Sequence, residues 1–105
     1  MQIQINTDRN IHGREKLAAE VRSVVEDVLS RFSDRITRVE VHLSDESSLH
    51  NSGQDDKRCM MEARLAGRQP TAVTHHAATV ELAVDGAAEK LKRSLESTLE
   101  RLEDH

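Results

Sequence analysis

The sequence has almost no aromatic residues: Phe32 is the single one, and tryptophan and tyrosine are absent. Sheet proteins that read single-stranded RNA stack its bases on exposed aromatic side chains. Phe32 falls in an apolar stripe that we expect to be buried, so no sheet of this protein can be such a stacking platform. Any contact with nucleic acid would therefore depend on the backbone and the shape of the ligand.

Cysteine is equally scarce, because Cys59 is the only one and no intrachain disulfide can form. It lies in an alternating segment, which favours a small, buried, apolar side chain. The alternative is a redox or nucleophilic cysteine, but no Cys-x-x-Cys motif or other reactive signature accompanies it.

The chain also lacks a long apolar run and a net positive charge. No stretch approaches the roughly 18 apolar residues that span a bilayer, and Met1 to Asn6 does not have the layout of a signal peptide. We therefore expect a cytoplasmic protein with no membrane partner, made of one domain over residues 1–105.

The net charge of −4 argues against indiscriminate binding of nucleic acid, but the charges are unevenly distributed. Acidic residues gather in the segments from Asp45 to Asp56 and from Glu96 to Asp104. Basic residues gather in four other segments: Arg9 to Lys16, Arg31 to Arg38, Lys57 to Arg68 and Lys90 to Arg93. The protein is therefore polarised in charge.

Apolar residues at spacings of three and four predict two amphipathic helices. The first runs from Arg14 to Phe32, and the second runs from about Val80 to Glu103, with Thr79 as a candidate N-cap. The valines of the first helix are poor helix formers, so packing against a sheet must stabilise it.

Alternation of apolar and polar residues predicts four strands, at Met1 to Asn6, Ile36 to Ser44, Lys57 to Ala66 and Thr71 to Ala77. The segment from Asp45 to Asp56 lacks apolar periodicity and is interpreted as a mobile hairpin loop. The order β-α-β-β-β-α predicts an α+β, two-layer sandwich in which two helices cover one face of a four-stranded sheet.

Two groups of basic residues are candidates for binding phosphate. On the second helix, Lys90 and Arg93 lie on one flank and several glutamates lie on the other; a solvated surface with pairs such as Glu89 and Arg93 explains them equally well. On the third strand, Lys57, Arg58, Arg64 and Arg68 form a second basic cluster, in which Arg58 and Arg64 share the open face of the sheet. The alternative is that these arginines pair across strands with Glu40 or Glu62.

No metal site, cofactor or catalytic centre is predicted. His12, His42, His50, His75 and His76, together with Cys59, show no zinc-site spacing, and the adjacent pair His75 and His76 would point to opposite faces of a strand. Phosphate-binding glycine loops, nucleophile elbows and His-Glu-x-x-His helices are all absent from the sequence.

Two segments resemble a known family. The stretch from Phe32 to Leu43, with the pattern Phe-x-Asp-Arg-Ile-x-x-Val-x-Val-x-Leu, and the stretch from Ala83 to Leu95, which begins Ala-Val-Asp-Gly, occur in the order and spacing found in bacterial ribosome hibernation-promoting factors. These are also described as ribosome-associated inhibitors or subunit-interface proteins, and this chain resembles their short form.

The resemblance implies a β-α-β-β-β-α fold similar to double-stranded RNA-binding domains with an extra first strand. It implies a partner, the small ribosomal subunit, whose messenger and transfer RNA channel is occupied under stress or in stationary phase so that translation stops. No small-molecule substrate is implied, and we expect a monomer.

Lys90 and Arg93 match basic positions of the family's closing helix. With the basic clusters they give the candidate residues for ribosomal RNA: Arg35, Arg38, Lys57, Arg58, Arg64, Lys90 and Arg93.

The chain departs from the family at three places. Glu96, Glu100, Glu103 and Asp104 occupy the region of a usually lysine-rich tail, and the loop from Asp45 to Asp56 is longer and more acidic than usual. Both changes weaken phosphate binding and make its salt dependence shallower. The chain ends at His105 without the extension that pairs ribosomes in long members, so we do not expect it to pair ribosomes unaided.

Two other functions stay open at this point. One is a protein-interaction module with the same fold that has lost RNA binding and meets a basic partner through its acidic loop or tail. The other is a small enzyme, which would need a pocket around His42, His75 and Cys59.

Overall fold

The structure is a computed structural model, and it describes residues 1–46 and 55–103. The described elements are the strands β1 (Gln2–Thr7), β2 (Ile36–Asp45), β3 (Lys57–Leu65) and β4 (Thr71–Ala77), the helices α1 (Arg14–Val28) and α2 (Val80–Glu103), and a short 3-10 turn (Ser30–Phe32). This β-α-β-β-β-α order is the one that the sequence predicts.

The four strands form one mixed sheet in the order β1-β2-β3-β4. β1 and β2 are parallel, because α1 carries the chain back to the starting end of the sheet, whereas β2, β3 and β4 are successively antiparallel. The predicted α+β fold class is confirmed. The likeness to double-stranded RNA-binding domains stays a prediction.

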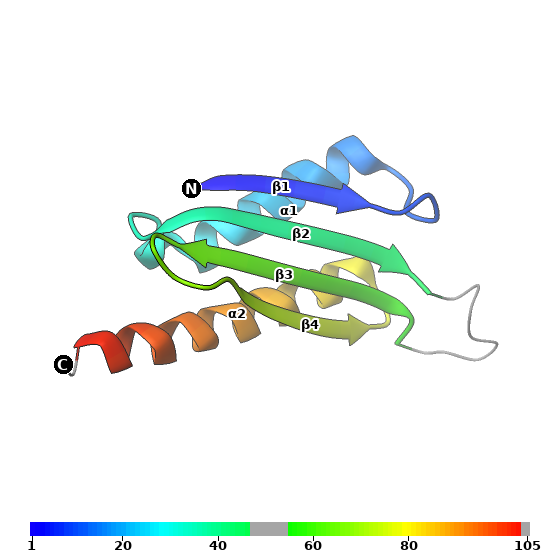
Figure 1. The fold of residues 1–105 in the computed structure, drawn as a ribbon. Coiled ribbons are helices and arrows are strands. Elements are labelled where there is room, and N and C mark those ends of the chain that lie inside the picture. The colour runs from blue at the N-terminus through cyan, green and yellow to red at the C-terminus, as the bar shows by residue number, and fades with distance from the viewer. Residues whose placement is uncertain (47–54, 104–105) are drawn as a thin grey trace.

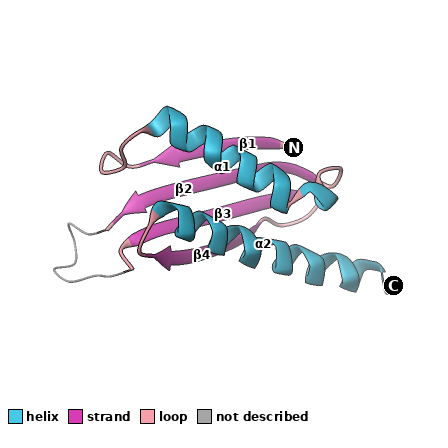
Figure 2. Ribbon diagram, turned by 180° about the vertical axis from the view of Figure 1, so that it is seen from behind, coloured by secondary structure: helices cyan, strands magenta, loops and turns pink. Residues whose placement is uncertain are grey.

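The helices lie side by side on one face of the sheet, with α1 over β1 and β2 and α2 over β3 and β4 (Figures 1 and 2). The core lies between the two layers and consists of aliphatic and sulfur-containing side chains with almost no exposure, among them Val25, Val39, Val41, Cys59, Met61, Leu91 and Leu95. The opposite face of the sheet is uncovered by any described element (Figure 1). One face of the sheet is therefore buried in the core, and the other is left open to solvent.

The first helix is shorter than predicted. α1 ends at Val28, and the chain then tightens into the 3-10 turn that ends at Phe32. Leu29 leaves the helical conformation at φ −101° and ψ 13°, and the Phe32 amide donates to the Leu29 carbonyl at 3.0 Å. A 3-10 turn satisfies backbone groups at a helix end while Phe32 stays in the core, 3% exposed.

The second helix begins as predicted. The amide of Leu82 donates to the Thr79 hydroxyl at 3.1 Å, which is the hydrogen bond of an N-cap. Inside α2, Gly86 faces the imidazole of His75 on β4, and a Cβ built at Gly86 would lie 2.1 Å from Cδ2 of that ring. The glycine therefore allows the helix to approach β4 closely.

The limits of β4 are as predicted, and those of the other three strands differ by at most one residue from the predicted ones. β1 is shifted by one residue, β3 ends at Leu65, and β2 continues to Asp45, which faces Lys57 in the ladder. Asp45 is therefore a strand residue and not part of the predicted loop. The centre of that loop, residues 47–54, lies outside the described residues. Within residues 1–46 and 55–103, neither helix has the length and hydropathy needed to cross a membrane.

Candidate nucleic-acid interface

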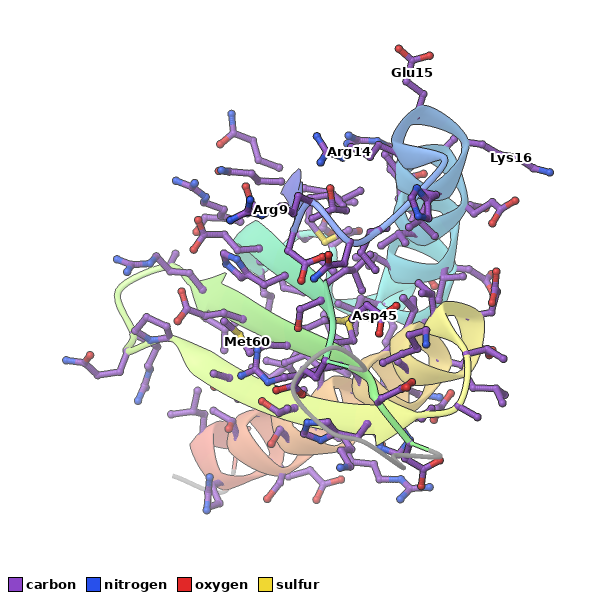
Figure 3. All side chains as sticks on the ribbon, turned by 90° about the vertical axis from the view of Figure 1, so that its right-hand side faces the viewer. Arg9, Arg14, Glu15, Lys16, Asp45 and Met60 are labelled. Atoms are coloured by element: carbon purple, nitrogen blue, oxygen red, sulfur yellow. The ribbon has the colours of Figure 1, made fainter. Side chains whose placement is uncertain are left out.

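The uncovered face of the sheet carries the polar side chains of β2 and β3 in sorted rows. Because side chains alternate between faces, the register places Arg38 opposite Arg64, Glu40 opposite Glu62, His42 opposite Met60, and Ser44 opposite Arg58. In the side view, Met60 lies on the sheet, and Glu15 and Lys16 extend from α1 (Figure 3). The register therefore places the Arg38–Arg64 pair at one end of this face and Arg58 at the other, with the Glu40–Glu62 pair between them.

Arg58 and Arg64 share this face, as the sequence predicts, but they stand far apart. Six residues separate them on β3, which corresponds to about 20 Å of extended strand. The prediction that they pair across strands with Glu40 or Glu62 is wrong: among the described residues neither guanidinium has an ion-pair or hydrogen-bond partner. Both can therefore bind an external anion without breaking an internal contact.

Arg38 is different, because its guanidinium already has two partners. It donates to the carboxylate of Glu40 at 2.9 Å and to the side-chain oxygen of Gln4 on β1. These contacts take up part of its charge and fix the side chain over the β1–β2 side of the sheet. Arg38 can still present its remaining N–H groups, but it is a weaker candidate than Arg64.

Lys57 lies on the helix side of the sheet, away from Arg58. Its ammonium contacts Asp56 at 2.8 Å and Asp45 at 3.4 Å, and hydrogen bonding to Asp56 raises the pKa of Lys57 above its usual value. The charge of Lys57 is thus balanced by two carboxylates. Alternation along β3 predicts the face of Lys57, and Asp56 is its neighbour in the chain. The ion pair with Asp45 depends on the strand register, which local sequence patterns do not show.

Lys90 and Arg93 bring α2 into the same region. The Lys90 ammonium donates to the backbone carbonyl of Thr74 at 2.8 Å, so this flank of α2 lies along the outer edge of β4. Arg93 is exposed and has no partner among the described residues, and the predicted pair with Glu89 does not form. Basic side chains therefore continue from the uncovered face of the sheet around its β4 edge.

Arg35 lies at the end of the sheet where β2 begins. Its carbonyl accepts from the Ala66 amide at 3.4 Å, and its exposed side chain borders a depression of about 250 Å³ together with Arg68. Arg68 belongs to the predicted basic cluster but not to the predicted site residues. The signal that could have identified it is its place within the turn sequence Gly67 to Pro70.

The outer face of the helix layer is acidic where the two helices meet. Glu20, Glu81 and Asp85 surround a small apolar depression of about 40 Å³ between the two helices. Glu96 of α2 lies 3.8 Å from Arg31 and links the second helix to the end of the first. Arg58 and Arg64 lie on the uncovered face of the sheet and Lys90 lies at the β4 edge, so this face and this edge form the candidate interface.

The enzyme hypothesis required one pocket around His42, His75 and Cys59, and the fold separates them. Cys59 and His75 are cross-strand partners on the helix side, whereas His42 lies on the uncovered face. Burial raises the pKa of the Cys59 thiol to about 12, so the nucleophilic thiolate is scarce near neutral pH. The described residues also contain no group of three or more histidine, cysteine or acidic side chains able to hold a metal ion.

Comparison with known proteins agrees with this architecture. The family model described as "Sigma 54 modulation protein / S30EA ribosomal protein" matches residues 4–103. The chain belongs to this family. No match is found among curated proteins.

Two solved structures of similar fold carry names from ribosome biology. The Protein Y N-terminal domain of Thermus thermophilus superposes with a TM-score of 0.66 at 22% identity, covering 93% of this chain and 99% of that one. A ribosomal subunit interface protein of Coxiella burnetii superposes with a TM-score of 0.67 at 17% identity, covering 93% of this chain and 97% of that one. At these identities the superpositions establish that this S30EA-family chain shares their fold.

Proposed function

We propose that this protein is a ribosome-associated translation inhibitor, a hibernation factor that binds ribosomal RNA of the small subunit. It occupies the messenger and transfer RNA channel under stress or in stationary phase, and it acts in the cytoplasm by blocking the site, without chemistry or a cofactor. Membership of the S30EA family over residues 4–103 carries the ribosomal part of this proposal.

The RNA part of the proposal rests on the availability of the basic side chains. Phosphate contacts supply most of the affinity of proteins for nucleic acid, and guanidinium groups suit them because they bind phosphate in a bidentate manner. Arg35, Arg58, Arg64 and Arg93 have no internal partner among the described residues, so they can contact RNA directly. Lys90 would give up its hydrogen bond to the Thr74 carbonyl in order to bind phosphate. Arg38 and Lys57 would keep their contacts with carboxylates and contribute less to RNA binding.

The mode of recognition follows from what this face presents. Its central rows carry Glu40, Glu62, His42 and Met60, and no aromatic side chain is available for stacking. The two acidic side chains disfavour a phosphate over the centre of β2 and β3. RNA would therefore be contacted at the margins of the sheet, by backbone and shape, as in recognition of folded RNA.

Cosedimentation of the purified protein with small ribosomal subunits across a salt series tests this function. We expect binding that weakens steadily as salt increases, and loss of binding in the variant Lys90→Glu/Arg93→Glu. The matched control is Arg14→Glu/Lys16→Glu, which makes the same change in charge on the first turn of α1 (Figure 3). Absence of binding by the unmodified protein at low salt would contradict the proposal and favour the protein-interaction module.

A further inference from the structure

The turn between β3 and β4 carries a hollow that the sequence did not reveal. It measures about 870 Å³ and opens to solvent where the end of β3, the start of β2 and the C-terminal part of α2 meet. Its polar lining comes from Thr37, Arg64, Arg68, Gln69, Thr71 and Thr98, and no carboxylate lines it. Two arginines and several residues with neutral hydrogen-bonding groups thus line one surface depression.

The charge of Arg64 is uncompensated inside the protein. Arg64 stands directly opposite Arg38 on β2, and like charges in such a pair destabilise a sheet. Arg38 has Glu40 as a partner, but Arg64 makes no ion pair with Glu62, its neighbour two residues away on the same face. Arg68 likewise has no partner among the described residues. A bound anion would relieve the repulsion between the two facing arginines.

The backbone that carries these two arginines is held in place. Gly67 adopts φ +71°, in the left-handed region that glycine tolerates, and the Arg68 amide donates to the Leu65 carbonyl at 3.1 Å to close the turn. On the β2 side, the Thr37 hydroxyl donates to the Arg64 carbonyl at 3.1 Å. The site therefore does not need to fold on binding, and preorganisation of this kind lowers the entropic cost of holding a ligand.

We propose that this hollow is a phosphate-binding subsite that takes a backbone phosphodiester of RNA between Arg64 and Arg68. The two guanidinium groups supply the charge, and Gln69 and Thr71 lie beside them as neutral hydrogen-bonding groups. The assignment of the phosphate to ribosomal RNA rests on the proposed function. Binding of a phosphate group in the hollow does not, so the two claims can fail separately.

Nuclear magnetic resonance titration of the full, 15N-labelled chain tests the subsite without ribosomes. Inorganic phosphate at constant ionic strength, and then a short single-stranded RNA, should shift the backbone amide signals of Gly67, Arg68 and Gln69 and the side-chain signals of both arginines. The variant Arg64→Gln/Arg68→Gln should bind each probe at least tenfold more weakly. Shifts elsewhere, or unchanged affinity, would overturn the subsite, and shifts with phosphate alone would overturn its assignment to RNA.

The matched control is Arg9→Gln/Arg14→Gln, which removes two exposed, unpaired arginines from the loop before α1 and from its first residue (Figure 3). In ribosome binding, loss of two phosphate contacts should lower the slope of log Kobs against log salt by roughly 1.4 to 1.8 for Arg64→Gln/Arg68→Gln and leave it unchanged for the control. Equal slopes for the two variants would overturn the subsite but leave the proposed function intact. Failure of the unmodified protein to bind small subunits would overturn the proposed function, and the titration would still decide the subsite.

Discussion

Met60 and Met61 are adjacent on β3, yet their side chains lie on opposite faces of the sheet. Met61 points into the layer between sheet and helices and is 0% exposed, whereas Met60 points to the uncovered face, opposite His42. The same contrast extends along β3, where Cys59, Ala63 and Leu65 are buried and Arg58, Glu62 and Arg64 alternate with them. Neighbouring residues of one strand thus alternate between the buried core and the open face of the sheet.

The two faces also differ in how completely their groups are satisfied. The covered face contains no buried polar or charged residue among the described ones, so no group there lacks a partner. On the uncovered face, Arg58 and Arg64 have no internal partner within the part of the chain that the structure describes, and Arg64 stands opposite Arg38. Packing explains the arrangement of the covered face, whereas the arginines of the uncovered face stay available to an external anion. Changes on the covered face should therefore alter stability, and charge changes on the uncovered face should alter binding.

The largest difference between the faces is expected for the two methionines. Met61→Ala should lower the free energy of unfolding by about 2–5 kcal/mol, because it removes a buried side chain and leaves a cavity. Met60→Ala should cost less, about 1 kcal/mol, because Met60 is only partly buried on the uncovered face. Chemical denaturation of the two variants measures the difference. Equal losses would mean that the uncovered face is buried in solution.

Burial of Cys59 on the covered face should make the stability of the protein depend on pH. Its pKa in the folded protein is about 12 against an ordinary value of 9.0, so between these values the unfolded chain loses a proton that the folded chain retains. Stability from this group is complete below pH 9 and falls by about 1.4 kcal/mol for each pH unit between 9 and 12. The stability difference between the protein and Cys59→Ala should shrink accordingly as pH rises. A constant difference would indicate an accessible, ionisable thiol.

Gly86 tests how closely α2 packs on the covered face. Gly86→Ala should destabilise the protein by about 1–3 kcal/mol, because the new Cβ collides with the His75 ring. In a His75→Ala background the same change should be neutral or stabilising by up to about 1 kcal/mol, since alanine favours a helix over glycine. Thermal unfolding of the four proteins gives the coupling. Additive effects would show that the ring and the helix are not in contact.

A smaller effect on stability is expected at the margin between the two faces. Lys90→Met removes the hydrogen bond to the Thr74 carbonyl and should cost about 0.5–1.5 kcal/mol. It should also weaken cosedimentation with small subunits, because a phosphate contact is lost. Lys90→Arg, which keeps the charge, is the control for the binding effect. Retained binding in Lys90→Met would remove this position from the interface.

The sequence predicted most of the fold because local periodicity and global packing agree in this chain. Thr79 and the limits of α2 and β4 were correct, since an N-cap and an alternating strand are local signals. The end of α1 was wrong because the apolar spacing continues through Phe32 while the backbone tightens at Leu29. Apolar spacing alone does not distinguish an α-helical turn from a 3-10 turn.

The candidate site was less predictable, because charge pairing depends on strand register. Alternation put Arg58 and Arg64 on one face, but only the register shows that Arg64 faces Arg38 and that Lys57 faces Asp45. The hollow at the β3–β4 turn joins residues from β2, β3 and α2 that lie far apart in the sequence. No local pattern could have brought them together.

In the proposed function, the uncovered face of the sheet binds RNA. Cosedimentation with small ribosomal subunits at low salt, comparing Arg58→Glu/Arg64→Glu with the control Glu40→Gln/Glu62→Gln, tests it directly, with thermal unfolding of both variants as a check of folding. We expect the arginine variant to lose binding by at least about 100-fold and the glutamate variant to bind as well as the unmodified protein or better, because central repulsion of phosphate is removed. Unchanged binding by a folded Arg58→Glu/Arg64→Glu variant would contradict the claim.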